Sequence, residues 1–155
     1  YKCLMPTNTF GPNDHYNALN SHFLPALIKK VHDLKLNNKK ELTLWGNGLA
    51  KREVIYVDDL ADACIFFMKK SFSGTTLNIG TGKDFSIKQY AKIILNKIMP
   101  KNKIKIKYDL SKPNGTPRKV LDIKLANKYG WKPKTKLDEA ITKTYLNFLE
   151  NNKVV

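Results

Sequence analysis

Met5-Pro6-Thr7-Asn8-Thr9-Phe10-Gly11-Pro12 and Asn20-Ser21-His22-Phe23-Leu24-Pro25 are the stretches around which the sequence is organised. The first follows two apolar residues and then breaks their pattern with proline, asparagine and glycine, which predicts a strand ending in a turn. The second opens a helical pattern, with Pro25 in its first turn and Ser21, or the asparagine before it, as the cap. Ligands of open α/β sheets bind where strands end. We therefore expect a functional site here, with His22 at a helix start beside it.

Strands and helices alternate along the rest of the chain, which indicates an α/β fold. Asp58 or Asp59 is expected to cap one helix, Ser86 to cap another, and 109–119 to form a structured loop. In the helix that Asp58 or Asp59 is expected to cap, the side chains expected to point inward are Leu60, Ala61, Ala63, Cys64, Phe67 and Met68. The expected strands are 2–5, 42–45, 52–57, 75–79 and 103–108, and the other expected helices are 24–36, 87–98, about 122–129 and 137–150.

Length and composition predict a globular domain. The 155 residues are 42% hydrophobic and 10% aromatic, enough to bury a core. No apolar run approaches the roughly 20 residues that cross a membrane, and no signal-peptide pattern opens the chain. Cys3 and Cys64 lie in apolar settings, which favours reduced core thiols in a cytoplasmic protein over a disulfide between them.

The net charge of +15 raises the possibility of nucleic-acid binding. The charge is carried by 26 lysines and only 2 arginines, and the lysines are spread along the chain. Phosphate and base recognition favours the planar fork of arginine, so nucleic acid is not the expected partner. A positive field would still attract an anionic nucleotide-sugar.

The strings MPTNTFGPND, NSHFLPALIKK, LWGNGLAKREVIYVDDLADA, LNIGTG, KPNGTPRKVLD, YGWKPKTKLDEAI and TYLNFLEN together resemble the GDP-L-fucose synthases. These are epimerase-reductases of the extended short-chain dehydrogenase/reductase superfamily, and the resemblance covers almost the whole chain. The glycine-rich dinucleotide fold and the Ser…Tyr-x-x-x-Lys catalytic set that begin this family have no counterpart before Tyr1. The resemblance implies that residues 1–155 are a C-terminal, substrate-binding portion without the N-terminal dinucleotide-binding half.

The implied fold is the C-terminal part of a Rossmann-type NAD(P)-binding fold plus a small α/β substrate-binding lobe. The implied enzyme uses NADP(H) to epimerise GDP-4-keto-6-deoxy-D-mannose at C3 and C5 and to reduce it at C4. Its expected partners are the N-terminal half of the same enzyme and, at full length, a second copy in a homodimer. This chain alone is then expected to be inactive. The alternatives are another nucleotide-sugar epimerase or reductase, and a non-catalytic module that binds a nucleotide-sugar or nucleic acid.

The resemblance implies that His22 is the catalytic acid of epimerisation, because the histidine of this NSH string has that role in the family. Pro6, Thr7, Asn8 and Thr9 match the segment that lines the nicotinamide end of the cofactor, and His22 belongs to that site as well. The family's base is a cysteine in the other half, and Cys3 does not match its position. From the residues alone, His22 could instead be a helix-capping or loop histidine.

The resemblance also implies that Lys30, Trp45, Arg52, Asn114 and Lys119 bind substrate. An aromatic face and two cations suit a GDP-sugar, although Trp45 could be a core residue and Lys30 a solvated one. The family usually has arginine in place of Lys30, which loses the bidentate fork here. It usually has aspartate in place of Asn114, which loses the charge.

Two further patterns are not expected to be functional. Tyr108 and Lys112 have Tyr-x-x-x-Lys spacing but fall on a strand leading into a loop, whereas the reductase pair needs a helical turn. Gly80-Thr81-Gly82 lacks the third glycine of a phosphate loop. His15 and His32 are expected at the surface, and no metal site is expected.

Overall fold

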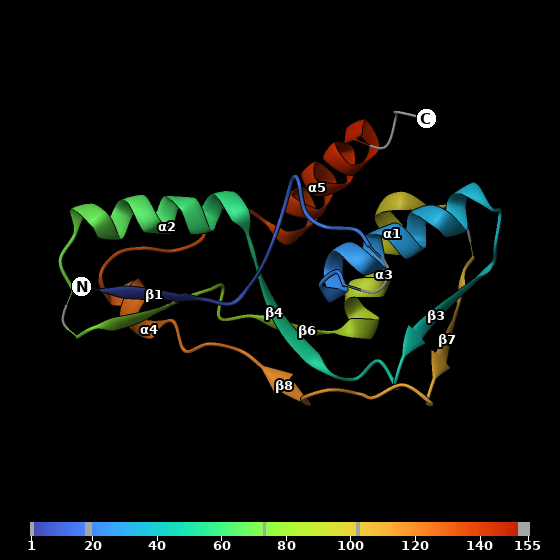
Figure 1. The fold of residues 1–155 in the computed structure, drawn as a ribbon, viewed down its shortest axis with the longest axis horizontal. Helices are drawn as coiled ribbons and strands as arrows, with labels where there is room; N and C mark the ends of the chain where they lie inside the picture. The colour runs from blue at the N-terminus through green and yellow to red at the C-terminus, as the bar shows by residue number, and fades with distance from the viewer. Residues whose placement is uncertain (1, 18–19, 73, 102, 152–155) are drawn as a thin grey trace.

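The computed structural model describes residues 2–17, 20–72, 74–101 and 103–151. Figure 1 shows an elongated molecule with one group of elements at each end and further strands between them. The helices are α1 (Phe23–Leu36), α2 (Val57–Lys69), α3 (Ile87–Ile98), α4 (Lys124–Lys128) and α5 (Leu137–Asn151). The strands are β1 (Cys3–Pro6), β2 (Asn8–Phe10), β3 (Glu41–Trp45), β4 (Lys51–Tyr56), β5 (Thr76–Ile79), β6 (Asp84–Ser86), β7 (Lys105–Asp109) and β8 (Arg118–Lys119).

The strands form three small, mostly parallel sheets, which confirms the α/β class. β1 pairs with β5, and β3 pairs with β7, both in parallel. The central sheet has the order β2-β4-β6, with β8 also paired to β4, and only the β4–β6 pair is antiparallel. β4 therefore lies at the centre of the molecule, between the two end groups (Figure 1).

Strand β4 contributes side chains to two separate hydrophobic cores. Val54 and Tyr56 belong to the core that α1, α3, α5 and β3 surround, while Ile55 packs with α2, α4 and β5. This division follows from strand geometry, because successive side chains point to opposite faces. The two cores are consequently joined through one buried strand.

The start of the chain differs from the expected strand and turn. β1 continues through Pro6, and the Thr7 N–H then donates to the Ile79 carbonyl at 3.0 Å. The chain next enters β2, which pairs with β4 rather than with β5. The Pro6–Thr9 segment thus passes from one sheet to another without turning back, and pairing to a distant strand overrides the local turn signals.

The helix starts also required correction. α1 begins at Phe23 with His22 in the N-cap position, and neither Ser21 nor the asparagine before it caps the helix. α2 begins at Val57, so Asp58 and Asp59 lie inside its first turn. The predicted cap of α3 is confirmed: Ser86 Oγ accepts from the Gln89 N–H, and Gln89 Oε1 accepts from the Ser86 N–H. This reciprocal arrangement is a capping box.

The predicted inward face of α2 was only partly right. Ala63 and Phe67 are buried and Leu60 packs against the same core, but Met68 is 85% exposed and Ile65 is 56% exposed. Ala61 is exposed too. Both cysteines are exposed free thiols, so the prediction that they are core residues was wrong. One side of α2 packs on the core, while Ile65 and Met68 on its other side are not covered by any element in the described part of the chain.

Smaller differences concern the last third of the chain. The expected strand at 103–108 is β7, shifted to Lys105–Asp109, and the expected loop at 109–119 ends in the two-residue strand β8. The helix expected at about 122–129 is the short α4, where Asp122 Oδ1 accepts from the Lys124 N–H at 2.9 Å. Of the 75–79 strand, which was expected to be buried, only Leu77 and Ile79 are buried.

Candidate functional site

A cleft of about 590 Å³ brings together the residues predicted to bind the cofactor. We call it the His22 cleft. Its lining residues are Pro6, Thr7, Asn8, Thr9, His22, Lys119, Val120 and Leu121. Lys119, which was predicted to bind substrate, therefore lies with His22 and not with the other predicted substrate residues.

The strand-end wall of the His22 cleft is fixed by hydrogen bonds to β4. Asn8 Nδ2 donates to the backbone carbonyl of Glu53 at 2.8 Å, and Thr7 Oγ1 donates to the same carbonyl at 3.2 Å. These two side chains are therefore committed to holding β2 against β4. The part of this wall that can bind a ligand is the backbone where β1 ends and β2 begins.

His22 stands at the start of α1 with its side chain exposed. Its carbonyl accepts the Ala26 N–H at 3.1 Å, which anchors the first helical turn. No hydrogen bond joins its imidazole to any residue that the structure describes. The ring is thus available to a ligand in the cleft.

A second hollow, of about 280 Å³, gathers four of the five predicted substrate residues: Lys30, Trp45, Arg52 and Asn114. We call it the Trp45 pocket. It is also lined by Ser21, Phe23, Ala26, Leu27, Leu44, Ala50, Ile87 and Pro113. Apolar side chains from α1, β3 and α3 form its walls, and the polar groups come from α1, β4 and the loop before β8. Because Ser21 lines this pocket and His22 lines the cleft, the two hollows adjoin at the start of α1.

Trp45 presents an aromatic face flanked by two ammonium groups. It ends β3 and is 54% exposed, so it is not a core residue. Lys30 Nζ lies 5.2 Å from its ring centroid, and Lys112 Nζ lies 5.7 Å away. Burial lowers the pKa of Lys30, and the Asp109 carboxylate partly opposes that shift. Lys112 was not predicted; its place at the start of the KPNGTPRK string was the only signal.

Arg52 is held in place by backbone carbonyl groups. Its Nη1 donates to the Thr116 carbonyl at 2.6 Å and to the Lys51 carbonyl at 2.8 Å. A methyl group on Gly115, whose φ is +69°, would lie 3.1 Å from Nη2, so glycine lets the loop approach the guanidinium closely. The remaining donors of Arg52 have no acceptor among the described residues and can bind an anion.

Asn114 uses its side-chain oxygen internally. Its Oδ1 accepts the Asn47 N–H at 2.7 Å, which ties the loop before β8 to the turn after β3. The amide nitrogen remains to face a ligand. The role predicted for Asn114 in binding substrate therefore involves a donor, in contrast to the acceptor that aspartate would offer.

The two patterns set aside in the sequence have structural explanations. The N–H groups of Thr81 and Gly82 both donate to Glu53 Oε1 at 2.6 Å, so they are already occupied by an internal carboxylate. Tyr108 lies on β7, while Lys112 lies beyond its end, so no helical turn places the pair on one face.

The other two histidines have different surroundings. His15 is exposed, as expected. His32 is half-buried, which corrects its prediction as a surface residue: its Nδ1 lies 3.0 Å from the Tyr145 hydroxyl, and its ring packs edge-on against Phe148. Desolvation lowers the pKa of His32, with the nearby Asp33 opposing the shift. The partners come from α5, more than 100 residues away in the sequence, so no local pattern reveals them.

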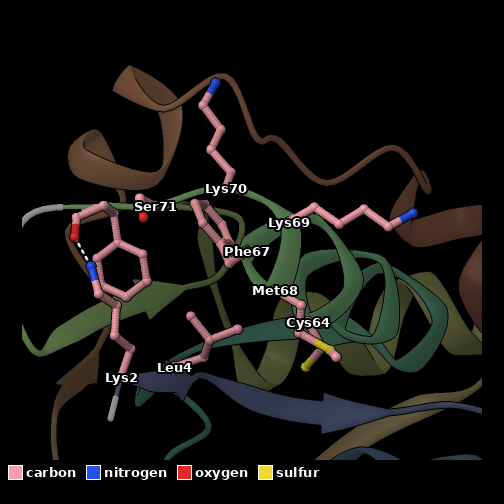
Figure 2. A pocket seen from close by; sticks show the side chains of 9 residues that line it. Lys2, Leu4, Cys64, Phe67, Met68, Lys69, Lys70 and Ser71 are labelled. Atoms are coloured by element: carbon pink, nitrogen blue, oxygen red, sulfur yellow. Dashed lines mark hydrogen bonds between the residues drawn. The ribbon is translucent and has the colours of Figure 1, made fainter.

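A third hollow lies elsewhere and contains none of the predicted site residues (Figure 2). It has a volume of about 600 Å³ and is lined by Lys2, Leu4, Cys64, Phe67, Met68, Lys69, Lys70, Ser71 and Phe72. Figure 2 shows Leu4 of β1 beneath Phe67 of α2. The Lys2 amine donates a hydrogen bond to the Phe72 carbonyl. We call this the β1–α2 surface.

Two kinds of feature are absent from the described part of the chain. Among residues 2–17, 20–72, 74–101 and 103–151, no helix is long and apolar enough to cross a membrane. No group of three histidine, cysteine, aspartate or glutamate side chains in the same residues is arranged to hold a metal ion.

Comparison with known proteins identifies the class to which this fold and site belong. Residues 1–80 match the NAD dependent epimerase/dehydratase family, and the chain belongs to that family. It is 42% identical over 147 residues to a protein described as putative GDP-L-fucose synthase 2 from Arabidopsis thaliana, covering 95% of this chain and 44% of that protein. It is 38% identical over 151 residues to GDP-L-colitose synthase from Yersinia pseudotuberculosis, covering 96% of this chain and 48% of that protein.

A solved structure gives the same result for the fold. The GDP-L-fucose synthetase from Naegleria fowleri bound to NADP superposes with a TM-score of 0.86 at 26% identity, covering 99% of this chain and 48% of that one. The chain thus spans about half the length of the relatives that it matches. The resemblance to GDP-L-fucose synthases seen in its sequence is confirmed.

Proposed function

We propose that this chain is the C-terminal, substrate-binding portion of an NADP(H)-dependent enzyme that converts GDP-4-keto-6-deoxy-D-mannose into GDP-L-fucose. The observation that carries the proposal is the assembly of Lys30, Trp45, Arg52 and Asn114 in one pocket beside the cleft that contains His22. The similarity to proteins described as GDP-L-fucose synthases supports the same assignment.

The Trp45 pocket has the chemistry that a nucleotide-sugar requires. The exposed ring of Trp45 offers a stacking face for a base, and the free donors of Arg52 suit a diphosphate oxygen. Lys30 adds a cation whose burial strengthens its attraction to an anion. The amide of Asn114 can donate to a sugar or phosphate oxygen.

His22 has the position of a proton donor in epimerisation. The 4-keto group makes the protons at C3 and C5 acidic, so a base in the N-terminal half can remove one and leave an enolate. The imidazolium of His22 then returns a proton to the opposite face of the same carbon. Its position between the two hollows allows it to reach a sugar bound in the Trp45 pocket.

The residues of the His22 cleft fit the nicotinamide end of NADP(H). The strand-end backbone offers polar groups, and Lys119 and His22 add donors that suit carboxamide, hydroxyl or phosphate oxygens. NADPH supplies the hydride for reduction at C4. Because the N–H groups of Thr81 and Gly82 bind Glu53, the described residues offer no glycine-rich turn for the pyrophosphate, which the N-terminal half would hold.

The β1–α2 surface gives the N-terminal half a place to pack. Its apolar side chains, including the exposed Met68 and the partly buried Leu4, would be covered by that half. We extend the proposal to a cytoplasmic homodimer at full length. The alternative is that the full-length protein is another nucleotide-sugar epimerase or reductase, and the similarity to a GDP-L-colitose synthase favours this alternative.

Retention on GDP-agarose in moderate salt tests the substrate class. The full-length enzyme should be retained and should elute with free GDP, whereas an Arg52→Ala variant should be lost in the wash. Nucleic-acid binding would instead weaken steeply with salt, because it depends on counterion release. Failure of free GDP to elute the wild-type enzyme would contradict the proposal.

A further inference from the structure

Glu53 is a charged side chain in an unusual position, because it is fully buried in the middle of β4 with 0% of its surface exposed. A buried carboxylate costs free energy unless hydrogen bonds or ion pairs compensate for it. Here the compensation comes from backbone N–H groups of two loops that are far apart in the sequence.

The first loop is the one after β5. Glu53 Oε1 accepts the N–H groups of Thr81 and Gly82, both at 2.6 Å, and the Thr81 hydroxyl at 3.3 Å. Gly80 makes room for this contact: a methyl group there would lie 2.3 Å from Oε1. The carboxylate therefore requires glycine at position 80 for reasons of space.

The second loop forms one wall of the His22 cleft. Glu53 Oε2 accepts the Leu121 N–H at 2.7 Å. Leu121 lines the cleft together with Lys119, the cation that faces the same space as His22. One carboxylate thus joins the 119–121 segment to the loop after β5.

The backbone of the same residue holds the opposite wall. The Glu53 carbonyl accepts the side chains of Thr7 and Asn8, both of which line the His22 cleft. Both walls of the cleft are consequently bonded to one residue, and their separation depends on it.

We infer that Glu53 is a positioning residue that sets the width of the His22 cleft. It does so by fixing Lys119 and Leu121 relative to the Thr7–Asn8 wall. The inference rests on the proposed function, in which this cleft receives the nicotinamide end of NADP(H). Glu53 contacts neither cofactor nor substrate, so its effect reaches the reaction only through the residues that it holds.

The test uses the full-length enzyme with Glu53→Gln, which keeps the size of the side chain but replaces one acceptor oxygen by an N–H donor. At least one of the three backbone N–H groups then loses its acceptor. Because a hydrogen bond to a charged group is lost in a buried place, we expect the KM for NADPH to rise about tenfold. The KM for the GDP-sugar should change by less than about twofold, since the Trp45 pocket does not include this network.

A second variant and a matched control separate positioning from stability. Gly80→Ala leaves Glu53 in place but displaces its carboxylate, so it should raise the KM for NADPH in the same direction. Glu41→Gln changes a half-exposed carboxylate paired with Lys107 on the neighbouring sheet and should leave both KM values unchanged. In the wild type, the Leu121 amide should exchange with solvent slowly, and in Glu53→Gln it should exchange at least about tenfold faster.

The outcomes distinguish this inference from the proposed function. A wild-type enzyme that does not use NADPH would overturn the proposed function itself. If the wild type is active and both Glu53→Gln and Gly80→Ala have the wild-type KM for NADPH, the inference about Glu53 is overturned. If Glu53→Gln does not fold, the kinetics of Gly80→Ala and the exchange of its Leu121 amide decide.

Discussion

The guanidinium of Arg52 donates to the backbone carbonyl of Thr116 at 2.6 Å, so the floor of the Trp45 pocket and the loop that closes it are joined by one side chain. Arg52 comes from β4, the central strand, and Thr116 comes from the loop before β8. Arg52 also lines the pocket, and its remaining guanidinium donors have no acceptor among the described residues. Arg52 accordingly both holds this loop in place and gives the pocket a positive charge.

Arg52→Ala should raise the KM for the GDP-sugar about tenfold or more and leave the KM for NADPH nearly unchanged, because only the GDP-sugar is proposed to contact this residue. Steady-state kinetics with each substrate varied in turn measures both values. Arg118→Ala is the matched control, since Arg118 pairs with Asp84 and lines neither hollow. Equal changes in the two KM values would indicate a structural role for Arg52.

His22→Asn should slow epimerisation by about a hundredfold or more, as the loss of a positioned acid does. Asparagine keeps a polar side chain at the start of α1, so the helix should remain intact. The measurement is the rate of solvent deuterium incorporation at C3 and C5. His15→Asn changes an exposed histidine that lines neither hollow and should leave that rate unchanged. Deuterium incorporation at the wild-type rate in His22→Asn would contradict the assignment of His22 as the acid.

His32 should make folding stability depend on pH. Its pKa is lowered in the folded protein by desolvation, so between that value and the ordinary pKa of about 6.5 the unfolded chain binds more protons. The contribution of neutral His32 to the stability of the folded protein is therefore fully present above about pH 6.5. It is lost as the pH falls through the pKa of His32 in the folded state. His32→Gln should show a smaller drop in melting temperature on acidification. Equal drops in the two proteins would refute this account.

The isolated 155-residue chain should not oxidise NADPH in the presence of the keto-sugar, because the residues that the structure describes include neither a glycine-rich turn free to hold a pyrophosphate nor a Tyr-x-x-x-Lys pair on a helix. It should also self-associate through the exposed apolar side chains of α2, among them Met68 and Ile65. Light scattering of a double variant, Ile65→Lys with Met68→Lys, should show less association. Leu36→Lys, at a single exposed leucine on α1, should not. Turnover by the chain alone would contradict the proposed division of labour.

The helices could be predicted well from the sequence because their apolar residues repeat at three- and four-residue steps. In α1, the buried side chains Leu24, Leu27, Ile28, Val31 and Leu34 follow that pattern. Local signals also identified Ser86 as the cap of α3. The four pocket residues and His22 were identified by resemblance, and the structure brings them into two adjoining hollows.

Interactions between distant residues could not be predicted in this way. Asp58 or Asp59 was expected to cap α2, yet Asp59 is buried and accepts the N–H groups of Lys134 and Thr135, 75 and 76 residues away. The two loops bound by Glu53 could not be inferred from its residue type, since a glutamate is usually exposed. The exposed cysteines belong to the same class of error, because burial depends on which elements cover a face.

The central claim is that this chain supplies the sugar-binding and proton-donating groups of an enzyme that both epimerises and reduces. Its most direct test is the reaction of the full-length enzyme with NADPH and GDP-4-keto-6-deoxy-D-mannose in deuterated water, with the product analysed by NMR. The account predicts GDP-L-fucose that carries deuterium at both C3 and C5. A reduced product without deuterium at either carbon would contradict it, because the enzyme would then be a simple reductase and His22 would have no proton to deliver.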